Sequence, residues 1–149
     1  PISERAPSGE VDVDVGQSDE LRVRHFHAKE RATNGMTFRW TRDESYVSIV
    51  GTAVDVRQLT LWMGDGGRPS AAGAAEADVY LDGAWLGHAT AGSGIQPYRF
   101  AIPPELARKA GSEDAPTLRL STHTWNPSKV IGGGDDRELG VMIDRIELR

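Results

Sequence analysis

The chain has 149 residues, of which 38% are hydrophobic and 26% are charged, as is usual for a globular domain. Its net charge of -5 and its lack of any basic block argue against nucleic acid or an anionic membrane surface as a partner. It has no cysteine, which excludes disulfides, thiolate metal sites and cysteine catalysis.

We expect one domain spanning residues 1–149, because this length can bury one core. The chain begins at Pro1 rather than at methionine, so we expect it to be a fragment of a larger protein. No apolar run in the sequence approaches the length of about 18 residues that a transmembrane helix needs, and we therefore expect no direct membrane insertion.

Apolar and polar residues alternate in short runs along the chain, and this pattern predicts β-strands. In chain order, we expect strands at 11–15, 21–27, 36–40, 46–50, 54–63, 76–81, 84–88, 98–102, 118–120 and 139–148. The alternation changes phase near Arg57–Gln58 and again between Ile143 and Ile146, which predicts a β-bulge at each place.

Turn residues separate these strands. Asp82-Gly83 is the strongest hairpin signal, and Asn34-Gly35 predicts a second turn. Residues 64–75 are rich in glycine and alanine and predict a long loop. Only the segment Pro103–Gly111 has the proline start, acidic first turn, basic last turn and glycine end of a short helix. The whole pattern predicts an all-β jelly-roll β-sandwich of about eight to ten antiparallel strands with one short helix.

Enzyme activity is not supported by any catalytic pattern. The sequence has no Gly-x-Ser-x-Gly turn, no phosphate-binding loop followed by a helix, and no βαβ unit for a dinucleotide. His25 and His27 are two apart on a predicted strand, so they would point to one side, either as a metal-binding pair or as ordinary sheet residues. The acidic residues include no pair that the sequence marks as glycosidase carboxylates.

Aromatic residues are the better candidates for ligand binding. By strand parity Trp62 and Tyr80 point away from the predicted core, Trp85 follows the Asp82-Gly83 turn, and Trp125 precedes the glycine-rich loop. An exposed indole ring beside polar groups suits the C–H face of a sugar. The alternative is that these side chains are packed under loops, because tryptophan is mostly buried on average. Trp40 continues the face of Met36 and Phe38, and we expect it in the core.

The loop near the C-terminus has three interpretations. Asp135 and Asp136 could ligate calcium through oxygen atoms, although the neighbouring Arg137 opposes a cation. Arg137 could instead pair with a carboxylate while an aspartate caps backbone N–H groups, which would make a structural clasp. Asp136 and Arg137 could also recognise sugar hydroxyls.

Several motifs occur in one order: Phe38-Arg39-Trp40-Thr41, Arg68-Pro69, the hairpin 79–87, Asn126-Pro127, and Asp136-Arg137-Glu138-Leu139-Gly140-Val141. This order, over residues 37–148, resembles the soluble β-sandwich domains of bacterial integral-membrane glycosyltransferases and related polysaccharide-assembly proteins. Those domains are similar in fold to carbohydrate-binding modules of the galactose-binding-like type.

The resemblance implies a non-catalytic, extracytoplasmic domain of a larger, membrane-anchored protein, and it does not by itself assign a sugar ligand. Together with the candidate aromatic residues, it leads us to expect a glycan or polysaccharide as the partner. Trp62, Tyr80, Trp85, Trp125, Asp136 and Arg137 are the predicted ligand-binding residues, with no cofactor expected and calcium at Asp135 and Asp136 as the alternative. The other hypothesis is a structural or interaction domain without a sugar ligand. Fold alone carries function only by analogy.

Overall fold

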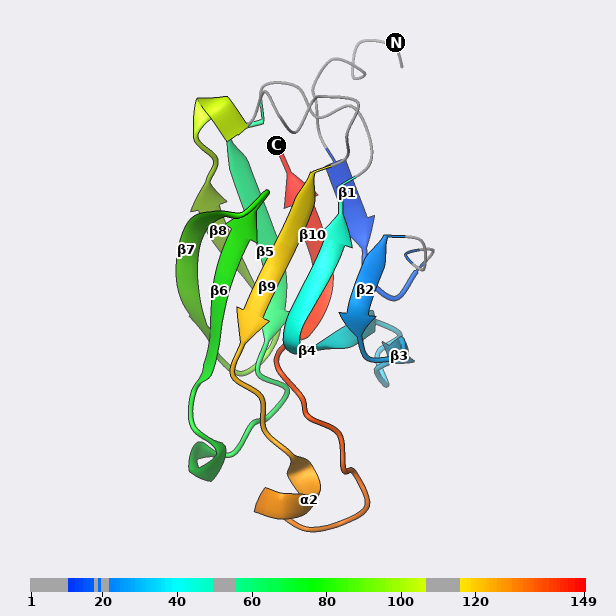
Figure 1. Ribbon diagram of the computed structural model, residues 1–149. Coiled ribbons are helices and arrows are strands. Elements are labelled where there is room, and N and C mark those ends of the chain that lie inside the picture. The colour runs from blue at the N-terminus through cyan, green and yellow to red at the C-terminus, as the bar shows by residue number, and fades with distance from the viewer. Residues whose placement is uncertain (1–10, 18, 20–21, 50–55, 107–115) are drawn as a thin grey trace.

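The computed structural model describes residues 11–17, 19, 22–49, 56–106 and 116–149, which form a β-sandwich (Figure 1). The strands are β1 (Val11–Asp14), β2 (Val23–Phe26), β3 (Glu30–Arg31), β4 (Thr37–Ser48), β5 (Gln58–Gly64), β6 (Ala75–Leu81), β7 (Ala84–Ala91), β8 (Gln96–Ala101), β9 (Thr117–Thr122) and β10 (Met142–Leu148). The 3-10 helix η2 (Ser70–Ala72) lies in the loop before β6, and the helix α2 (Pro127–Val130) follows β9. The predicted all-β jelly-roll sandwich is confirmed.

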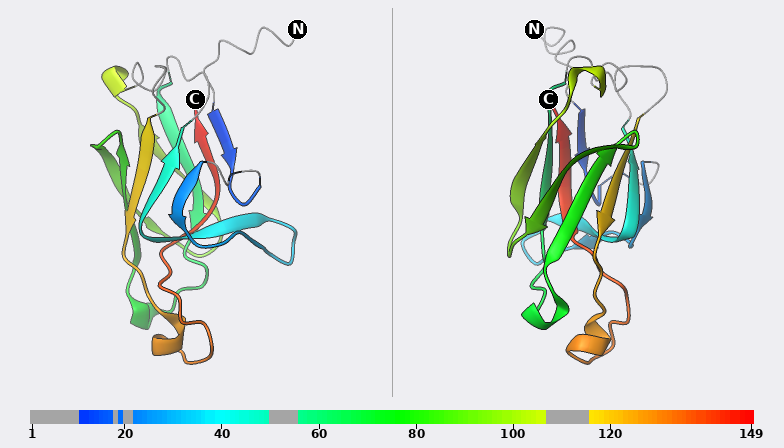
Figure 2. Two further views of the ribbon diagram at one scale, coloured as in Figure 1. Left: turned by 45° about the vertical axis from the view of Figure 1, so that its right-hand side comes forward. Right: turned by 60° about the vertical axis from the view of Figure 1, so that its left-hand side comes forward.

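Two antiparallel layers face each other (Figure 2). One sheet contains β1, β10, β5 and β8, and the other contains β7, β6, β9, β4 and β2. The long strand β4 belongs to both layers. Its first half pairs with β10 at Arg39 and Trp40, and its second half pairs with β9 from Glu44 to Ser48. The change occurs at Arg42 and Asp43, which are exposed.

The main core lies between the two sheets and consists of their inward-facing aliphatic side chains. The largest of these that are fully buried are Ile49, Leu59, Leu61, Met63, Leu81, Leu118, Leu120, Ile143, Ile146 and Leu148. A second, smaller core contains Phe38, Trp40, Trp125 and Leu139. The burial of Trp40 beside Phe38 confirms the face predicted for that strand.

Local turn and bulge signals are largely confirmed. Asp82 and Gly83 both have positive φ, 50° and 84°, and join β6 to β7 as a tight hairpin. β10 has a register shift between Ile143 and Arg145, as its change of phase predicts. The bulge predicted near residues 57–58 is also confirmed, because the N–H groups of Arg57 and Gln58 both donate to the carbonyl of Arg149, at 2.6 and 2.9 Å, and both residues are exposed between buried Val56 and Leu59.

Other predicted boundaries need correction. The predicted strands at 36–40 and 46–50 are one continuous strand, β4, as far as Ser48. Residues 104–106 are helical, and the rest of the predicted helix lies outside the described residues. The helix α2 is an unpredicted element, although its start has Asn126 as a side-chain cap and Pro127 at the first helical position. Among the described residues, no helix is long and apolar enough to cross a membrane.

Candidate functional site

The predicted aromatic residues do not gather in one place. Trp85 and Tyr80 lie opposite each other on β7 and β6 and point outward from one sheet. Trp62 is on β5, beside Arg145 of β10, and points outward from the other sheet. The indole N–H of Trp62 donates to Glu147 Oε1 at 3.2 Å, and the side chain is half-buried.

Trp125 is a packing residue. Its side chain is 7% exposed and belongs to the second core with Trp40 and Leu139. Its backbone forms a bridge with Leu139 through two hydrogen bonds of 2.9 and 2.8 Å. The ring of Trp125 therefore offers no open face to a sugar, unlike the ring of Trp85, which is 59% exposed.

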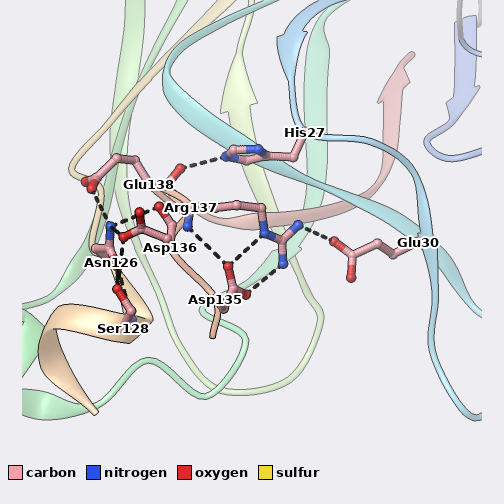
Figure 3. A network of polar contacts seen from close by, with 8 residues as sticks. All are labelled: His27, Glu30, Asn126, Ser128, Asp135, Asp136, Arg137 and Glu138. Carbon is pink, nitrogen blue, oxygen red and sulfur yellow. Dashed lines mark hydrogen bonds and ion pairs between the residues drawn. The ribbon is translucent and has the colours of Figure 1, made fainter. Parts of the chain in front are cut away.

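Arg137 is held between two carboxylates (Figure 3). Its Nε and Nη2 donate to the two oxygens of Asp135 at 3.0 and 2.9 Å, and its Nη1 donates to Glu30 Oε2 at 2.8 Å. The backbone N–H of Arg137 also donates to Asp135 Oδ1 at 3.2 Å. These are the contacts of the structural clasp, and they join the loop after α2 to β3.

Asn126 organises the other half of the loop. Its Nδ2 donates to the Asp136 carbonyl, to Asp136 Oδ1 and to Glu138 Oε2, each at 3.0 Å (Figure 3). Its Oδ1 accepts from the backbone N–H of Ser128 at 3.0 Å and caps α2. One buried amide thus fixes the start of the helix and both acidic side chains. This role of Asn126 is not among the predictions from the sequence, although its position before Pro127 is a capping signal.

These residues border an open pocket of about 670 Å³, which we call the end pocket. It is lined by His27, Ala28, Arg42, Asp43, Thr124, Asp136, Arg137 and Glu138. His27 is buried and its Nε2 lies 2.7 Å from the Glu138 carbonyl, which can only accept, so Nε2 carries the proton. Of the predicted site residues, Asp136 and Arg137 line this pocket, whereas Trp62, Tyr80, Trp85 and Trp125 do not.

The histidine pair predicted from strand parity is not formed. A register shift between Arg24 and Phe26 interrupts the alternation of β2, and His25 has a positive φ of 61°. His25 is consequently exposed while His27 is buried. The two imidazoles do not share one environment, because the irregular backbone replaces the regular pleat that the prediction assumed.

The charges of the loop are stabilised in their ionised forms. The hydrogen bonds from Arg137 lower the pKa of Asp135 from 3.8 to about 2. The hydrogen bonds from Asn126 and Ser128 lower the pKa of Asp136. Asp135 and Glu30 in turn raise the pKa of Arg137. The end pocket therefore presents the carboxylate of Asp136 and the guanidinium group of Arg137 in ionised form and held in place by their neighbours.

The loop is poorly suited to calcium in this arrangement. Both oxygens of Asp135 accept from Arg137, and Oδ1 of Asp136 accepts from Asn126 and Ser128. A cation at these oxygens would lie beside the guanidinium group. Within the described residues, no group of three or more His, Asp or Glu side chains is placed to hold a metal ion.

The fold is that of carbohydrate-binding modules. The chain is similar to the CBM36-1 domain of a multidomain xylanase from the hindgut metagenome of Trinervitermes trinervoides, with 14% identity, 94% of this chain and 96% of that one covered, and a TM-score of 0.51. It is also similar to a family 35 carbohydrate binding module from an environmental isolate, with 14% identity, coverage of 88% and 90%, and a TM-score of 0.52.

A third similar structure is the family 35 carbohydrate binding module from Clostridium thermocellum, with 8% identity, coverage of 92% and 96%, and a TM-score of 0.53. No protein-family model matches the chain, and the comparison with curated proteins found no match. At these identities the similarity establishes the fold, while the ligand has to be argued from the site.

Proposed function

We propose that this chain is a non-catalytic carbohydrate-binding domain whose glycan ligand enters the end pocket. The observation that carries the proposal is the set of fixed donors and acceptors around that pocket. Asp136 and Arg137 are already held by neighbouring side chains, so little conformational entropy is lost when they bind a ligand. Carboxylate and guanidinium groups at fixed positions suit the vicinal hydroxyls of a sugar.

The charge state of Asp136 argues against its use as the acid of a hydrolase. A glycosidase needs a general acid whose pKa is raised so that it stays protonated. In the end pocket the pKa of Asp136 is lowered, because Asn126 and Ser128 donate hydrogen bonds to its ionised form. This shift is opposite to the one that an acid catalyst requires and supports a binding role.

Arg42 gives the cleanest test of the end pocket. It contacts its neighbours through the backbone, since its N–H donates to Ser45 Oγ and its carbonyl accepts from Thr122 Oγ1. Truncation to alanine leaves these bonds in place and removes a charged group from the lining. We expect calorimetric titration with soluble polysaccharides to show binding by the unaltered chain and weaker binding by Arg42→Ala.

Equal binding by Arg42→Ala would exclude its side chain from the ligand site. Failure of the unaltered chain to bind any polysaccharide tested would favour the alternative of a structural or interaction domain. In that case the clasp between Arg137, Asp135 and Glu30 would serve only to stabilise the loop.

We further propose that the domain is an extracytoplasmic part of a membrane-anchored glycosyltransferase-type protein. The support for this context is the ordered set of sequence motifs that ends in Asp136-Arg137-Glu138-Leu139-Gly140-Val141. An antibody raised against the chain should detect a larger polypeptide in the membrane fraction of the source cells. Detection of a small polypeptide in the soluble fraction alone would contradict the proposal.

A further inference from the structure

The outer face of one sheet has an ordered row of side chains that the end pocket does not use. Trp85, Tyr80, Arg119, Tyr46 and Arg24 lie in register across β7, β6, β9, β4 and β2. Neighbouring strands are about 4.8 Å apart, so the row extends over roughly 19 Å. None of its members lines the end pocket, and the β6–β7 turn lies toward the end of the sandwich away from α2 (Figure 1).

A bulge in β7 places the indole ring of Trp85 on this face. Tyr80 pairs with Trp85 and Asp78 pairs with His88, so the four residues 85–88 of β7 lie opposite the three residues 78–80 of β6. The extra residue lets Leu86 turn inward against the main core while Trp85 and His88 both point outward. In a regular strand Trp85 and His88 would point to opposite faces.

The exposed ring of Trp85 is fixed in orientation. Its indole N–H donates to Asp78 Oδ1 at 3.1 Å, and His88 Nδ1 lies 3.1 Å from the same oxygen. Trp85 remains 59% exposed despite this bond. Among the described residues, the other exposed large hydrophobic side chains are Val130, at 38%, and Ile131, at 65%, which belong to α2 and its C-cap. A fixed, exposed indole on a sheet face is suited to stacking rather than to packing.

The row continues with guanidinium groups stacked on rings. The Arg119 guanidinium lies 3.8 Å from the centre of the Tyr80 ring, and the Arg24 guanidinium lies 5.1 Å from the centre of the Tyr46 ring. Arg119 also pairs with Glu44 at 2.7 Å, and Ser121 Oγ donates to the other oxygen of Glu44 at 2.6 Å. These contacts hold Arg119 flat against the sheet.

Charges of both signs are interspersed on the face, since it carries the guanidinium groups of Arg24 and Arg119 and the carboxylates of Glu44, Glu76 and Asp78. Arg119 pairs with Glu44, His88 lies between Glu76 and Asp78 at 3.2 and 3.1 Å, and His123 lies 3.6 Å from Glu76. A strongly charged ligand therefore meets no large field of opposite sign. The paired groups still offer donors and acceptors beside an exposed ring, which fits an uncharged, hydroxyl-rich chain.

We propose that this face is a second carbohydrate-binding surface, separate from the end pocket, on which a neutral glycan chain stacks on Trp85 and lies along the row toward Tyr46. Asp78, His88 and Arg119 would bind its hydroxyls. The surface does not depend on the end pocket, because the two share no lining residue. A chain bound at both sites would gain affinity from their linkage.

The test is chemical-shift mapping on the ¹⁵N-labelled full chain with cellohexaose, xylohexaose and mannohexaose, and with hexagalacturonate as a charged comparison. We expect at least one neutral oligosaccharide to shift the amides of β6, β7 and β9. Trp85→Ala should weaken this binding about tenfold, which corresponds to ~1.4 kcal/mol, and Trp85→Phe should retain part of it. Ile131→Ala is the control, because it removes a side chain that is 65% exposed at a different place.

The outcomes separate the two sites. Shifts confined to the residues of the end pocket, and lost in Arg42→Ala, would overturn the second surface while the proposed function stands. Shifts on the sheet face that are lost in Trp85→Ala and kept in Arg42→Ala support the second surface, whatever happens at the pocket. Absence of shifts on this face with all three neutral probes, or stronger binding of hexagalacturonate there, would also overturn the inference.

Discussion

Arg39 and Asp19 form a buried, two-point ion pair: Arg39 Nε donates to Asp19 Oδ2 at 2.9 Å, and Nη2 donates to Oδ1 at 3.0 Å. The N–H of Gly16 also donates to Asp19 Oδ2 at 3.0 Å, and Arg39 Nη1 donates to the His27 carbonyl at 3.1 Å. The pair thus connects β4 to the segment after β1 and to the backbone beside the end pocket.

Arg39→Met should lower the free energy of unfolding by ~3–5 kcal/mol, because it leaves the buried Asp19 carboxylate without its charged partner. Urea denaturation measures this. Arg145→Met is the matched control, since Arg145 pairs with Asp12 at 2.7 Å in an exposed position and should cost under ~1 kcal/mol. Similar losses for the two variants would show that burial of the Asp19 pair has little energetic effect.

Gly140→Ala should destabilise the domain by ~1–3 kcal/mol, because an added Cβ would collide with the hydroxyl oxygens of Thr41 and Thr122. Thr41 Oγ1 already accepts from the N–H of Val141 at 2.9 Å, so it has little freedom to move. The measurement is the urea midpoint. Gly134→Ala should change it little, since no atom lies within 4 Å of a Cβ at Gly134.

Trp125→Ala should cost ~3–5 kcal/mol of unfolding free energy, because it leaves a cavity in the second core. Trp85→Ala should change the same quantity by less than ~1 kcal/mol, because most of its ring is exposed. The two losses of unfolding free energy can be compared by thermal denaturation of both variants under the same conditions. A large loss in Trp85→Ala would mean that its ring contributes to packing.

The pairing of Asp135 with Arg137 should make stability depend on pH only in acid. Arg137 lowers the pKa of Asp135 from 3.8 to about 2. The contribution of Asp135 to the free energy of unfolding is therefore fully present above about pH 4 and is lost as the pH falls through about 2. We expect this contribution to be under ~1 kcal/mol, since both side chains of the pair are partly exposed. A carboxyl NMR titration should place the Asp135 pKa near 3.8 in Arg137→Met. An unchanged value would contradict the assigned cause.

Removal of calcium should leave glycan binding and thermal stability unchanged, because Arg137 donates to both oxygens of Asp135. Titration in excess EDTA, compared with titration in excess calcium, measures both effects. Stronger binding with calcium would mean that Asp135 or Asp136 exchanges its present hydrogen bonds for a metal ion.

Local signals in the sequence predicted the features that depend on neighbouring residues. The Asp82-Gly83 hairpin follows from turn chemistry, and the bulge in β10 follows from a change of alternation. The burial of Trp40 follows from its parity with Phe38. In each case the residues within a few positions determine either the backbone conformation or the face of the strand on which a side chain lies.

Features that depend on distant residues were missed. Arg39 has the parity of an outward residue between Phe38 and Trp40, yet Asp19 makes its burial favourable. His88 had no carboxylate neighbour in the sequence, and the register of β7 with β6 brings it to Asp78. The position of Trp125 before the glycine-rich loop predicts a ligand-binding residue, but its bridge to Leu139, 14 residues along the chain, places its ring in the second core.

Strand β4 connects the two layers mechanically, because it pairs with β10 in one layer and with β9 in the other. Detaching either sheet requires backbone hydrogen bonds of this one strand to break, so the two layers should lose structure together. Amide hydrogen exchange would then give similar opening free energies on both sides of the Arg42–Asp43 bend. The bend itself supplies lining residues of the end pocket, so a ligand held there would slow the opening of the whole sandwich.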